Sequence, residues 1–314
     1  MAEKFSEQIR ACGLFFISIV VLVIIPLVYH CFVVVTCIPM LDTNPASGIV
    51  LLVFFHLLLI LMLVSYWKTI FTEPGFVPYT YDEAWLSELH LASRFGLEAD
   101  ATENVIGSDE PNVTVTEKKR DGRQRKCGKC KKIKPDRAHH CKYCGRCVLK
   151  MDHHCPWVNN CIGFRNYKFF MLFCMYCTLA AFYVTVTLFS GFIAALSQNE
   201  PIEFGGTEME YLFTFLLMAT TSTVLLGFTG FHLMLVCKNM STIEHLEKRD
   251  PNKKDQENPF DLGRSANWKQ VFGDNPLLWF IPVGEVKGNG VDWNTRSGMS
   301  SDAYGRGDLT ADVP

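Results

Sequence analysis

The stretch KMDHHCPWVNNC, residues 150–161, places an acid, two histidines and a thiol in four consecutive positions. Asp152, His153, His154 and Cys155 could be metal ligands, because zinc in proteins is bound by Cys, His and carboxylate groups. They could equally form an activated nucleophile, in which a carboxylate orients an imidazole that takes the proton of a thiol. The choice between these two chemistries decides whether the segment is structural or catalytic.

The segment around this stretch is rich in metal-ligating residue types. Of the 13 cysteines in the chain, seven lie within residues 127–161, together with four histidines. The pairs Cys127/Cys130 and Cys141/Cys144 have the two-residue spacing of zinc knuckles. Two tetrahedral zinc ions need eight ligands. One all-cysteine site plus one site of three cysteines and a histidine would use every cysteine here. Two sites of three cysteines and a histidine each would leave one thiol over. Counting alone leaves both schemes open.

Four long stretches of the chain contain no Asp, Glu, Lys or Arg: residues 11–41, 43–67, 169–199 and 211–237. Each contains the ~20 apolar residues that a helix needs to cross a bilayer. A spanning segment must satisfy its own backbone hydrogen bonds, which favours helices and excludes an open sheet. The sequence therefore predicts an all-α polytopic membrane protein. Its four transmembrane helices would carry a cytosolic, zinc-stapled Cys-rich module between the second and third.

The distribution of positive charge predicts the orientation of these helices. The connections 42–48 and 197–210 contain no Lys or Arg, whereas Lys4 and Arg10 precede the first helix. The remaining basic residues lie in the central segment and the C-terminal region. By the positive-inside rule, both termini and the Cys-rich module should face the cytosol.

The chain is expected to divide into seven parts. They are a cytosolic N-terminus (1–10), helices 1 and 2 (11–71), a cytosolic linker (72–125), the Cys-rich module (126–168), helices 3 and 4 (169–237), a cytosolic C-terminal region (238–283) and a disordered tail (284–314). Residues 81–95 could form a short amphipathic helix. The apolar run 277–281 is too short to span a membrane. It should pack against the module or rest at the lipid interface. No internal repeat is expected.

A basic run leads into the Cys-rich module. Residues 117–150 contain 14 Lys or Arg against three acids. Such a run can bind anions or an acidic membrane surface, or it can simply form a solvated face.

Together these motifs resemble the DHHC-type protein S-acyltransferases, the palmitoyltransferases. The resemblance is carried by the position of the module between the second and third helices and by Cys127-x2-Cys130, Lys134-Pro135-Asp136-Arg137, His139-His140-Cys141, Cys144, Asp152-His153-His154-Cys155 and Cys161. It covers most of the chain except residues 96–116 and the tail.

The resemblance implies two structural zinc ions with interleaved ligands. One would take Cys127, Cys130, His140 and Cys147, and the other would take Cys141, Cys144, His154 and Cys161. Cys155 would then be the nucleophile, His153 its base and Asp152 the group that polarises His153. From the residues alone, Asp152 could instead only orient a zinc-bound histidine.

Two family motifs are altered here. The family has Asp-Pro-Gly after the second helix and Thr-Thr-x-Glu after the fourth, whereas this chain has Glu73-Pro74-Gly75 and Ser241-Thr242-Ile243-Glu244. Both changes keep a carboxylate or a hydroxyl. The resemblance gives supporting roles to Ser241, Thr242 and Glu244, and a structural one to Asn267.

The implied substrates are a long-chain acyl-CoA such as palmitoyl-CoA and a cytosol-facing cysteine of a membrane or peripheral protein. The acyl group would pass through a thioester on Cys155. Lys134, Arg137 and His139 are candidates for holding CoA phosphates. Trp157 could sit at the interface near the thioester or simply pack in the core. The lipid bilayer is the other expected partner, and nucleic acid is not expected. The location that the resemblance implies is a eukaryotic endomembrane (Golgi or ER) or the plasma membrane.

Several intramembrane residues have two interpretations. His30, His56 and His232 lack an intramembrane acid and are expected to be satisfied interior or interfacial histidines. Small residues such as Ala180, Ala181 and Gly191 could allow helix contacts or shape the deep end of an acyl cavity. Two other functions compete with the acyltransferase: a membrane-anchored zinc module that only binds partners, and a transporter. The transporter is disfavoured because the apolar stretches lack Asp, Glu, Lys and Arg.

Overall fold

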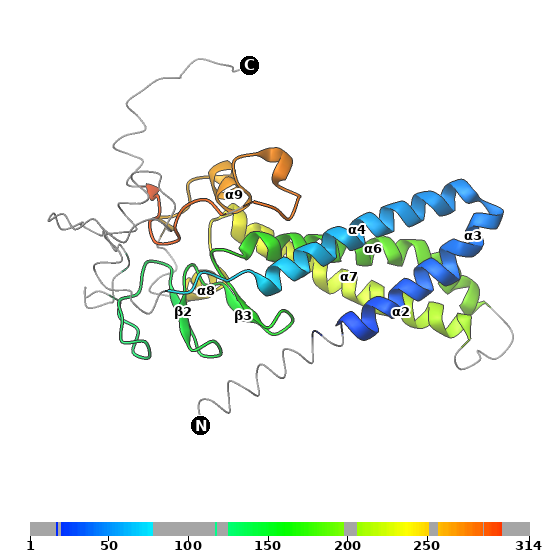
Figure 1. The fold of residues 1–314 in the computed structure, drawn as a ribbon, viewed down its shortest axis with the longest axis horizontal. Coiled ribbons are helices and arrows are strands. Elements are labelled where there is room, and N and C mark those ends of the chain that lie inside the picture. Colours follow the sequence, from blue (N-terminus) through cyan, green and yellow to red (C-terminus); the bar gives the residue numbers. More distant parts are fainter. Residues whose placement is uncertain are drawn as a thin grey trace, which may run out of the picture.

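The predicted four-helix membrane architecture is confirmed. The computed structural model describes residues 17, 20–77, 117, 125–197, 206–250, 257–284 and 286–296. Within this part of the chain, four helices are long and apolar enough to cross a membrane: Leu22–Thr43, Pro45–Phe71, Tyr167–Leu196 and Thr207–Cys237. The predicted helix at 81–95, residues 1–10 and the end of the tail lie outside the described residues. Figure 1 shows the helices side by side, with the module and the C-terminal region at one end of the bundle.

The first span is a continuous helical run in which proline changes the local geometry. It contains α2 (Ile25–Tyr29) and α3 (Ile38–Thr43), separated by the π-helical segment His30–Cys37. Pro26 and Pro39 lie in the first turns of α2 and α3. Proline lacks an N–H and clashes with the carbonyl four residues earlier, so the turn before it cannot keep regular α-helical bonds. The wider segment lets the helix continue past Pro39.

The other three spans are regular α-helices. α4 (Pro45–Phe71) begins after Asn44, whose side-chain oxygen accepts a hydrogen bond from the Ser47 N–H at 3.3 Å and so caps the helix. α6 (Tyr167–Leu196) packs against both α4 and α7 (Thr207–Cys237). α6 is therefore the central helix of the bundle, and it begins directly after the Cys-rich module.

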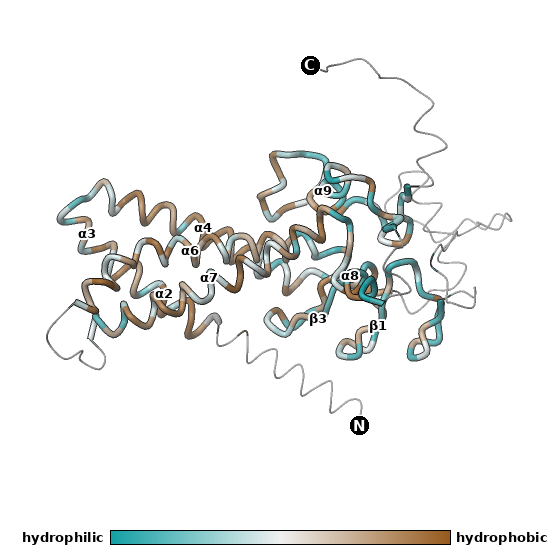
Figure 2. Tube along the Cα trace, turned by 180° about the vertical axis from the view of Figure 1, so that it is seen from behind, coloured by the Kyte–Doolittle hydropathy of each residue, from teal (hydrophilic) through white to brown (hydrophobic). Residues whose placement is uncertain are grey.

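Two short β-hairpins form the core of the Cys-rich module. β1 (His139–Cys141) pairs with β2 (Arg146–Val148), and β3 (His153–Cys155) pairs with β4 (Asn160–Ile162), both antiparallel. These strands lie in a mostly helical protein, as expected for a small metal-stapled module. Figure 2 shows that the module is mainly hydrophilic, whereas the bundle is mainly hydrophobic.

Side-chain amides tie the module to the ends of the helices. The Asn160 amide donates to three carbonyls at the end of α4 at 3.0–3.2 Å, where the helix leaves carbonyls without partners. The Tyr66 hydroxyl donates to the Trp157 carbonyl at 3.0 Å. Before α6, Asn166 accepts a hydrogen bond from the Gly163 N–H at 2.9 Å. These bonds fix the β3–β4 hairpin over α4 and α6.

The C-terminal region returns to the same end of the bundle. α8 (Thr242–Glu247) follows α7 after a short turn, and α9 (Arg264–Phe272) packs against α7 and α6. Figure 1 shows α8 beside the strands of the module and α9 on the other side of the bundle's end. Segments far apart in the sequence thus meet at the module's end of the bundle.

Replacing Gly163 with a larger residue is predicted to lower the stability of the protein. A Cβ at this position would lie 2.6 Å from Val148 Cγ1 and 2.7 Å from the Pro74 carbonyl oxygen. The substitution Gly163→Ala should therefore lower the free energy of unfolding by about 1–3 kcal/mol through overpacking. Thermal unfolding of the purified protein in detergent measures this effect. Gly128→Ala is the matched control, because nothing lies within 4 Å of its Cβ position. Equal midpoints for the two variants would contradict the prediction.

Candidate functional site

The first group of metal-ligating residues converges on His140. The Nδ1 atom of His140 lies 3.5 Å from Cys127 Sγ, 3.2 Å from Cys130 Sγ and 3.9 Å from Cys147 Sγ. Zinc–sulfur bonds of about 2.3 Å in a tetrahedron place neighbouring donor atoms about 3.5–3.8 Å apart. The donor set and its spacing therefore fit a tetrahedral metal ion.

The second group converges in the same way on His154. Its Nδ1 atom lies 3.7 Å from Cys141 Sγ, 3.5 Å from Cys144 Sγ and 3.6 Å from Cys161 Sγ. The Sγ atoms of Cys144 and Cys161 are 3.4 Å apart. Three soft thiolates and one imidazole are a typical structural zinc set. These are the same eight residues that the resemblance implied, and each cluster could hold one metal ion.

The two groups have the same spacing, offset by 14 residues. In each group the second Cys, the His and the last Cys follow the first Cys by 3, 13 and 20 positions. The backbone repeats at the same interval, in the antiparallel pairs Lys126↔Ile133, His140↔Cys147 and His154↔Cys161. The expectation of no internal repeat is therefore wrong. The signal in the sequence was the pattern C-x2-C-x9-H-x6-C, which occurs twice.

A third unit of this repeat contains Cys155. A left-handed backbone conformation recurs every 14 residues, with φ of 61° at Lys131, 68° at Gly145 and 47° at Asn159. Cys155 thus occupies the position of the first thiol of a knuckle. Where the other two knuckles carry their second cysteine, this hairpin carries Val158. Cys155 lies outside both metal-ligating clusters.

Cys155 lies beside an imidazole held by a carboxylate. His153 Nδ1 donates to Asp152 Oδ2 at 2.6 Å. Burial would lower the pKa of His153, but hydrogen bonding and charge from Asp152 and Cys155 raise that pKa to about 9. When a thiol, an imidazole and a carboxylate lie in this order, the imidazole can take the proton of the thiol. The carboxylate then stabilises the positive charge on the ring.

Asp152 is fixed by the segment that follows the fourth helix. The Thr242 N–H donates to Asp152 Oδ1 at 2.8 Å, and the Thr242 hydroxyl donates to Oδ2 at 2.8 Å. Burial would raise the pKa of Asp152, but the hydrogen bond and charge of His153, together with His232 and the Thr242 N–H, hold that pKa below its usual value. The buried carboxyl group therefore stays ionised and keeps its contact with His153.

His232 completes a third cluster with Asp152 and His153, whose ligand atoms lie within 4.8 Å of one another. His232 is buried in α7, and its Nδ1 is 3.1 Å from the Tyr167 hydroxyl. Its ring centroid is 6.0 Å from that of His153. Hydrogen bonds from Thr242, His153 and Tyr167 already occupy Asp152 and one nitrogen of His232. We therefore interpret the cluster as a hydrogen-bonded support of the Asp152–His153 pair. This agrees with the expectation of a satisfied interior histidine.

Arg137 is fully buried and directed into the protein. Its guanidinium donates to both Glu244 carboxylate oxygens at 2.7 and 2.8 Å and to Asn239 at 2.8 and 3.1 Å. It also lies 4.5 Å from the ring centroids of Phe260 and Trp293. Arg137 was a candidate for holding CoA phosphates, but this placement favours a structural ion pair. It joins the module to the C-terminal region.

The other three candidates for substrate contacts have different environments. Lys134 is half-buried. His139 is half-buried, and burial together with Arg125 lowers its pKa to about 4, so it carries no charge near neutral pH. Trp157 is 49% exposed and lines the same cavity as Cys155. Its exposure favours a position at the interface over ordinary core packing.

The residues with expected supporting roles all cap or brace the C-terminal region. Ser241 and Glu244 form a reciprocal capping box at the start of α8. The Asn267 amide donates to the Cys237 carbonyl at 2.8 Å and to Asp261 at 2.7 Å. Glu73 accepts a hydrogen bond from the Phe76 N–H at 3.1 Å. The altered residues Glu73 and Ser241 thus both make local capping contacts.

An apolar cavity of about 550 Å³ opens beside Cys155. All four spanning helices contribute to its lining, which includes Tyr66, Phe170, Cys174 and Met218. Along α6 the lining extends from Phe170 to Val184, a distance of about 21 Å at 1.5 Å per residue. The cavity therefore joins the thiol to the interior of the bundle.

The small residues of α6 have two different roles. Ala180 and Ala181 line the cavity. Gly191 instead faces Tyr211, because a Cβ there would lie 2.5 Å from the tyrosine ring. The structure thus places the alanines at the cavity and the glycine at a helix contact, which the sequence could not separate.

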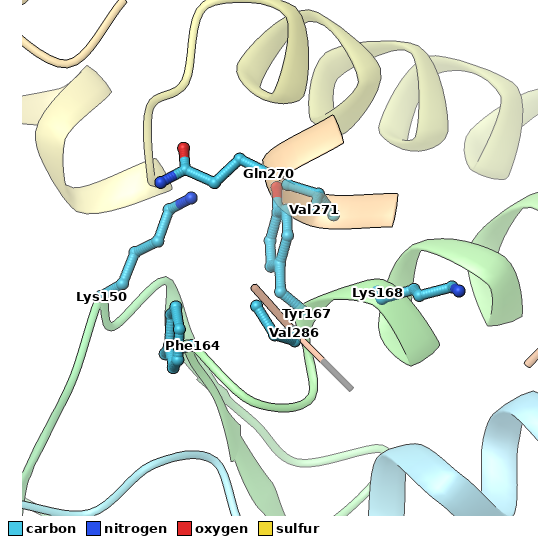
Figure 3. A pocket seen from close by; sticks show the side chains of 7 residues that line it. All are labelled: Lys150, Phe164, Tyr167, Lys168, Gln270, Val271 and Val286. Carbon is cyan, nitrogen blue, oxygen red and sulfur yellow. The ribbon is translucent and has the colours of Figure 1, made fainter. Parts of the chain in front are cut away.

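A much smaller space of about 10 Å³ lies between the module and α9 (Figure 3). Lys150, Tyr167 and Gln270 are among the residues that line it. Burial and the nearby Arg137 lower the pKa of Lys150 to about 7. A space of this size holds one water molecule at most. It belongs to the packing of the C-terminal region and not to the thiol's cavity.

Comparison with known proteins gives a consistent result. Residues 120–249 match the family model described as DHHC palmitoyltransferase. Over 289 residues the chain is 36% identical to "Probable protein S-acyltransferase 13" of Arabidopsis thaliana. This match covers 89% of this chain and 88% of that relative. It is 35% identical over 286 residues to "Palmitoyltransferase ZDHHC20" of Mus musculus, and this match covers 85% of this chain and 74% of the relative. It is also 35% identical over 269 residues to "Palmitoyltransferase ZDHHC2" of Mus musculus, and this match covers 85% of this chain and 72% of the relative.

Metal analysis of point variants tests the two ligand groups. The wild-type protein should bind about two zinc ions per chain. Cys130→Ser and Cys144→Ser should each lose about one, because each removes a ligand from a different group. Cys155→Ser is the matched control and should keep both ions. The measurement is elemental analysis of purified protein. Loss of zinc from the Cys155 variant would contradict the assignment of that thiol as uncoordinated.

The buried Arg137–Glu244 pair is predicted to be important for stability. Arg137→Met leaves the Glu244 carboxylate without its partner and should lower the free energy of unfolding by about 3–5 kcal/mol. The double variant Arg137→Met/Glu244→Gln should recover part of this loss, because no unpaired charge remains. Lys269→Met removes an exposed charge from α9 and should have an effect within about 0.5 kcal/mol. Similar thermal midpoints for Arg137→Met and Lys269→Met would refute the prediction.

Proposed function

This chain belongs to the DHHC palmitoyltransferase family, and from that premise we propose that it transfers palmitate from acyl-CoA to a protein cysteine through a thioester on Cys155. Its relatives are named as palmitoyltransferases and protein S-acyltransferases, so the chain is an enzyme of the acyltransferase class. The donor, the intermediate and the residue roles are the proposed part.

The observation that carries the proposal is the position of one thiol. Cys155 lies outside both metal-ligating clusters, next to the Asp152–His153 pair and at the wall of the apolar cavity. Each neighbour supplies one requirement of acyl transfer. The pair can move a proton, and the cavity can take the fatty chain.

In the first step, the Cys155 thiolate attacks the thioester carbonyl of acyl-CoA. The new bond to Cys155 forms, the carbonyl–sulfur bond to CoA breaks, and the CoA thiolate takes the proton held by His153. In the second step, His153 accepts the proton of the target cysteine, whose thiolate attacks the acyl-enzyme. Cys155 then leaves as a thiolate, so the two steps are chemically balanced and each exchanges one thioester for another.

The cavity supports a long-chain substrate. Transfer of an acyl chain out of water contributes about 0.8 kcal/mol per CH₂. The apolar lining from Phe170 to Val184 is deep enough for many such groups. Trp157 stands at the wall near Cys155, where the thioester would sit. We propose that Ala180 and Ala181 help to set the space available to the chain.

Two structural zinc ions would position this chemistry. Cys127, Cys130, His140 and Cys147 would hold one, and Cys141, Cys144, His154 and Cys161 the other. The bound ions would fix the hairpins, because small loops with little apolar core need such a staple. Asp152 would keep its polarising role toward His153, supported by Thr242.

The remaining proposals concern substrate contacts and location. Because the guanidinium of Arg137 is engaged by Glu244 and Asn239, we assign the contact with CoA phosphates to Lys134 and to other residues of the basic run. The chain is a multi-pass membrane protein. Its module and both termini would face the cytosol, where the cysteine of a membrane or peripheral protein would accept the acyl group.

The proposal is tested by acyl labelling. Purified protein is incubated with labelled palmitoyl-CoA, and the hydroxylamine-sensitive label is measured. We expect label on the wild type and a loss of at least about 100-fold in Cys155→Ser, because a serine hydroxyl is far less acidic than a thiol. Cys174→Ser is the matched control, since Cys174 also lines the cavity. It should retain the label.

Each alternative function predicts a different outcome. A zinc module that only binds partners would acquire no label in any variant. Label that persists in Cys155→Ser would place the nucleophile elsewhere. Zinc content measured on the same samples separates loss of chemistry from loss of folding.

A further inference from the structure

The loop after α9 presents a cluster of apolar side chains to its surroundings. Residues 276–283 include Leu277, Phe280, Ile281 and Val283, which are 81%, 49%, 43% and 37% exposed. We call these four large exposed apolar residues within seven positions the apolar patch, and clusters of this kind mark interaction surfaces. The sequence left two environments open for this run: the module or the lipid interface. The exposed fractions show that the protein leaves more than a third of each of these residues uncovered, and most of Leu277.

The backbone of the loop is satisfied from within the protein. Lys168, in the first turn of α6, donates its ammonium group to the carbonyls of Leu278 at 2.9 Å, Val283 at 2.8 Å and Phe272 at 3.4 Å. The Tyr176 hydroxyl donates to the Phe280 carbonyl. Irregular backbone near hydrocarbon is tolerated only where protein groups satisfy its polar atoms. Lys168 and Tyr176 meet this requirement for the loop.

The contact with Tyr176 fixes the depth of the loop along α6. Tyr176 lies eight residues beyond Lys168, which is about 12 Å along the helix. Helical side chains lean toward the N-terminus, so the Tyr176 hydroxyl lies about one turn nearer to the module. α6 is about 45 Å long, which exceeds the ~30 Å hydrocarbon core by about 15 Å. Centred in a bilayer, its hydrocarbon portion begins near Leu172. The loop therefore lies at the boundary between headgroups and acyl chains.

The loop that carries the apolar patch lies beside the outer surface of the bundle. On α6, Leu179 and Phe182 are 50% and 59% exposed and face outward from the same helix that the loop contacts. Figures 1 and 2 both show the loop after α9 beside the module end of the bundle, and Figure 2 shows it as hydrophobic. Just before residues 276–283, the exposed Asp274 pairs with Lys287 at 2.7 Å. The apolar run therefore directly follows a charged, exposed position of the chain.

From these contacts we infer that residues 276–283 insert their apolar side chains into the lipid leaflet on the module's side of the membrane. The partner is the upper acyl-chain region of that leaflet. Interfacial segments bury their apolar face about 5–10 Å into this boundary. Trp279 and Trp268 pack against the protein core and so anchor the loop from its protein side. The loop would hold α9 against the bilayer, and through Asn267 it would hold the end of α7.

Site-specific photocrosslinking in lipid nanodiscs tests this contact. The photoreactive residue p-benzoylphenylalanine replaces Leu277 in the full-length protein, and adducts are identified by mass spectrometry. Phe182 is the matched positive position, because it is exposed on a spanning helix. Arg264, exposed at the start of α9, is the matched negative position. We expect phospholipid adducts at Leu277 within about threefold of those at Phe182, and at least tenfold fewer at Arg264.

Two outcomes would overturn the inference. Adducts from Leu277 to a second copy of the chain, without lipid adducts, would make the patch a protein–protein surface. A lipid yield at Leu277 as low as that at Arg264 would place the loop in water. The crosslinking yield does not depend on acyl transfer, so this experiment tests the membrane contact independently of the proposed function. Unchanged zinc content in the labelled proteins shows that the module is folded.

Discussion

The convergence of interleaved Cys and His side chains into two groups, each of which could hold a metal ion, is the constraint on which the rest of the site depends. The module has two short hairpins and little apolar core of its own. Binding free energy at two groups of three cysteines and a histidine would therefore supply its folding free energy. His154 belongs to a metal group, and its neighbours on β3 are His153 and Cys155. Successive residues of a strand point to opposite faces. Fixing His154 on one face therefore fixes where His153 and Cys155 point on the other.

A second set of interactions joins this module to the end of the fourth helix. Thr242 holds Asp152 with two hydrogen bonds, and the buried Arg137–Glu244 pair lies beside them. A buried ion pair of this kind contributes little net stability over an apolar pair, but its loss is costly. Its role here is positional: the C-terminal region must be docked for Asp152 to stay in place. The proposed catalytic machinery is therefore distributed between the module and residues about 90 positions later.

The cavity and the repeat together explain why one cysteine differs from the others. Cys155 is equivalent to Cys127 and Cys141 in the 14-residue repeat, yet Val158 replaces the second thiol of its knuckle. An apolar residue at that position removes a metal ligand and lets the hairpin face the helices. The side of Cys155 away from His153 then meets the apolar wall of the bundle. A scaffold with two groups that could hold metal ions thus presents one thiol outside both groups to a hydrophobic space.

The sequence by itself determined the four spans, the module between the second and third, and the residue types available for chemistry. Charge-free apolar stretches and Cys spacing are local signals, so they can be read from the sequence without knowledge of the fold. Counting ligands did not decide between the zinc schemes. Only tertiary structure brought Thr242 to Asp152, buried Arg137 against Glu244, and separated Ala180 at the cavity from Gly191 at Tyr211. Such contacts join residues far apart in the chain, and their energies depend on burial and distance, which composition and spacing do not contain.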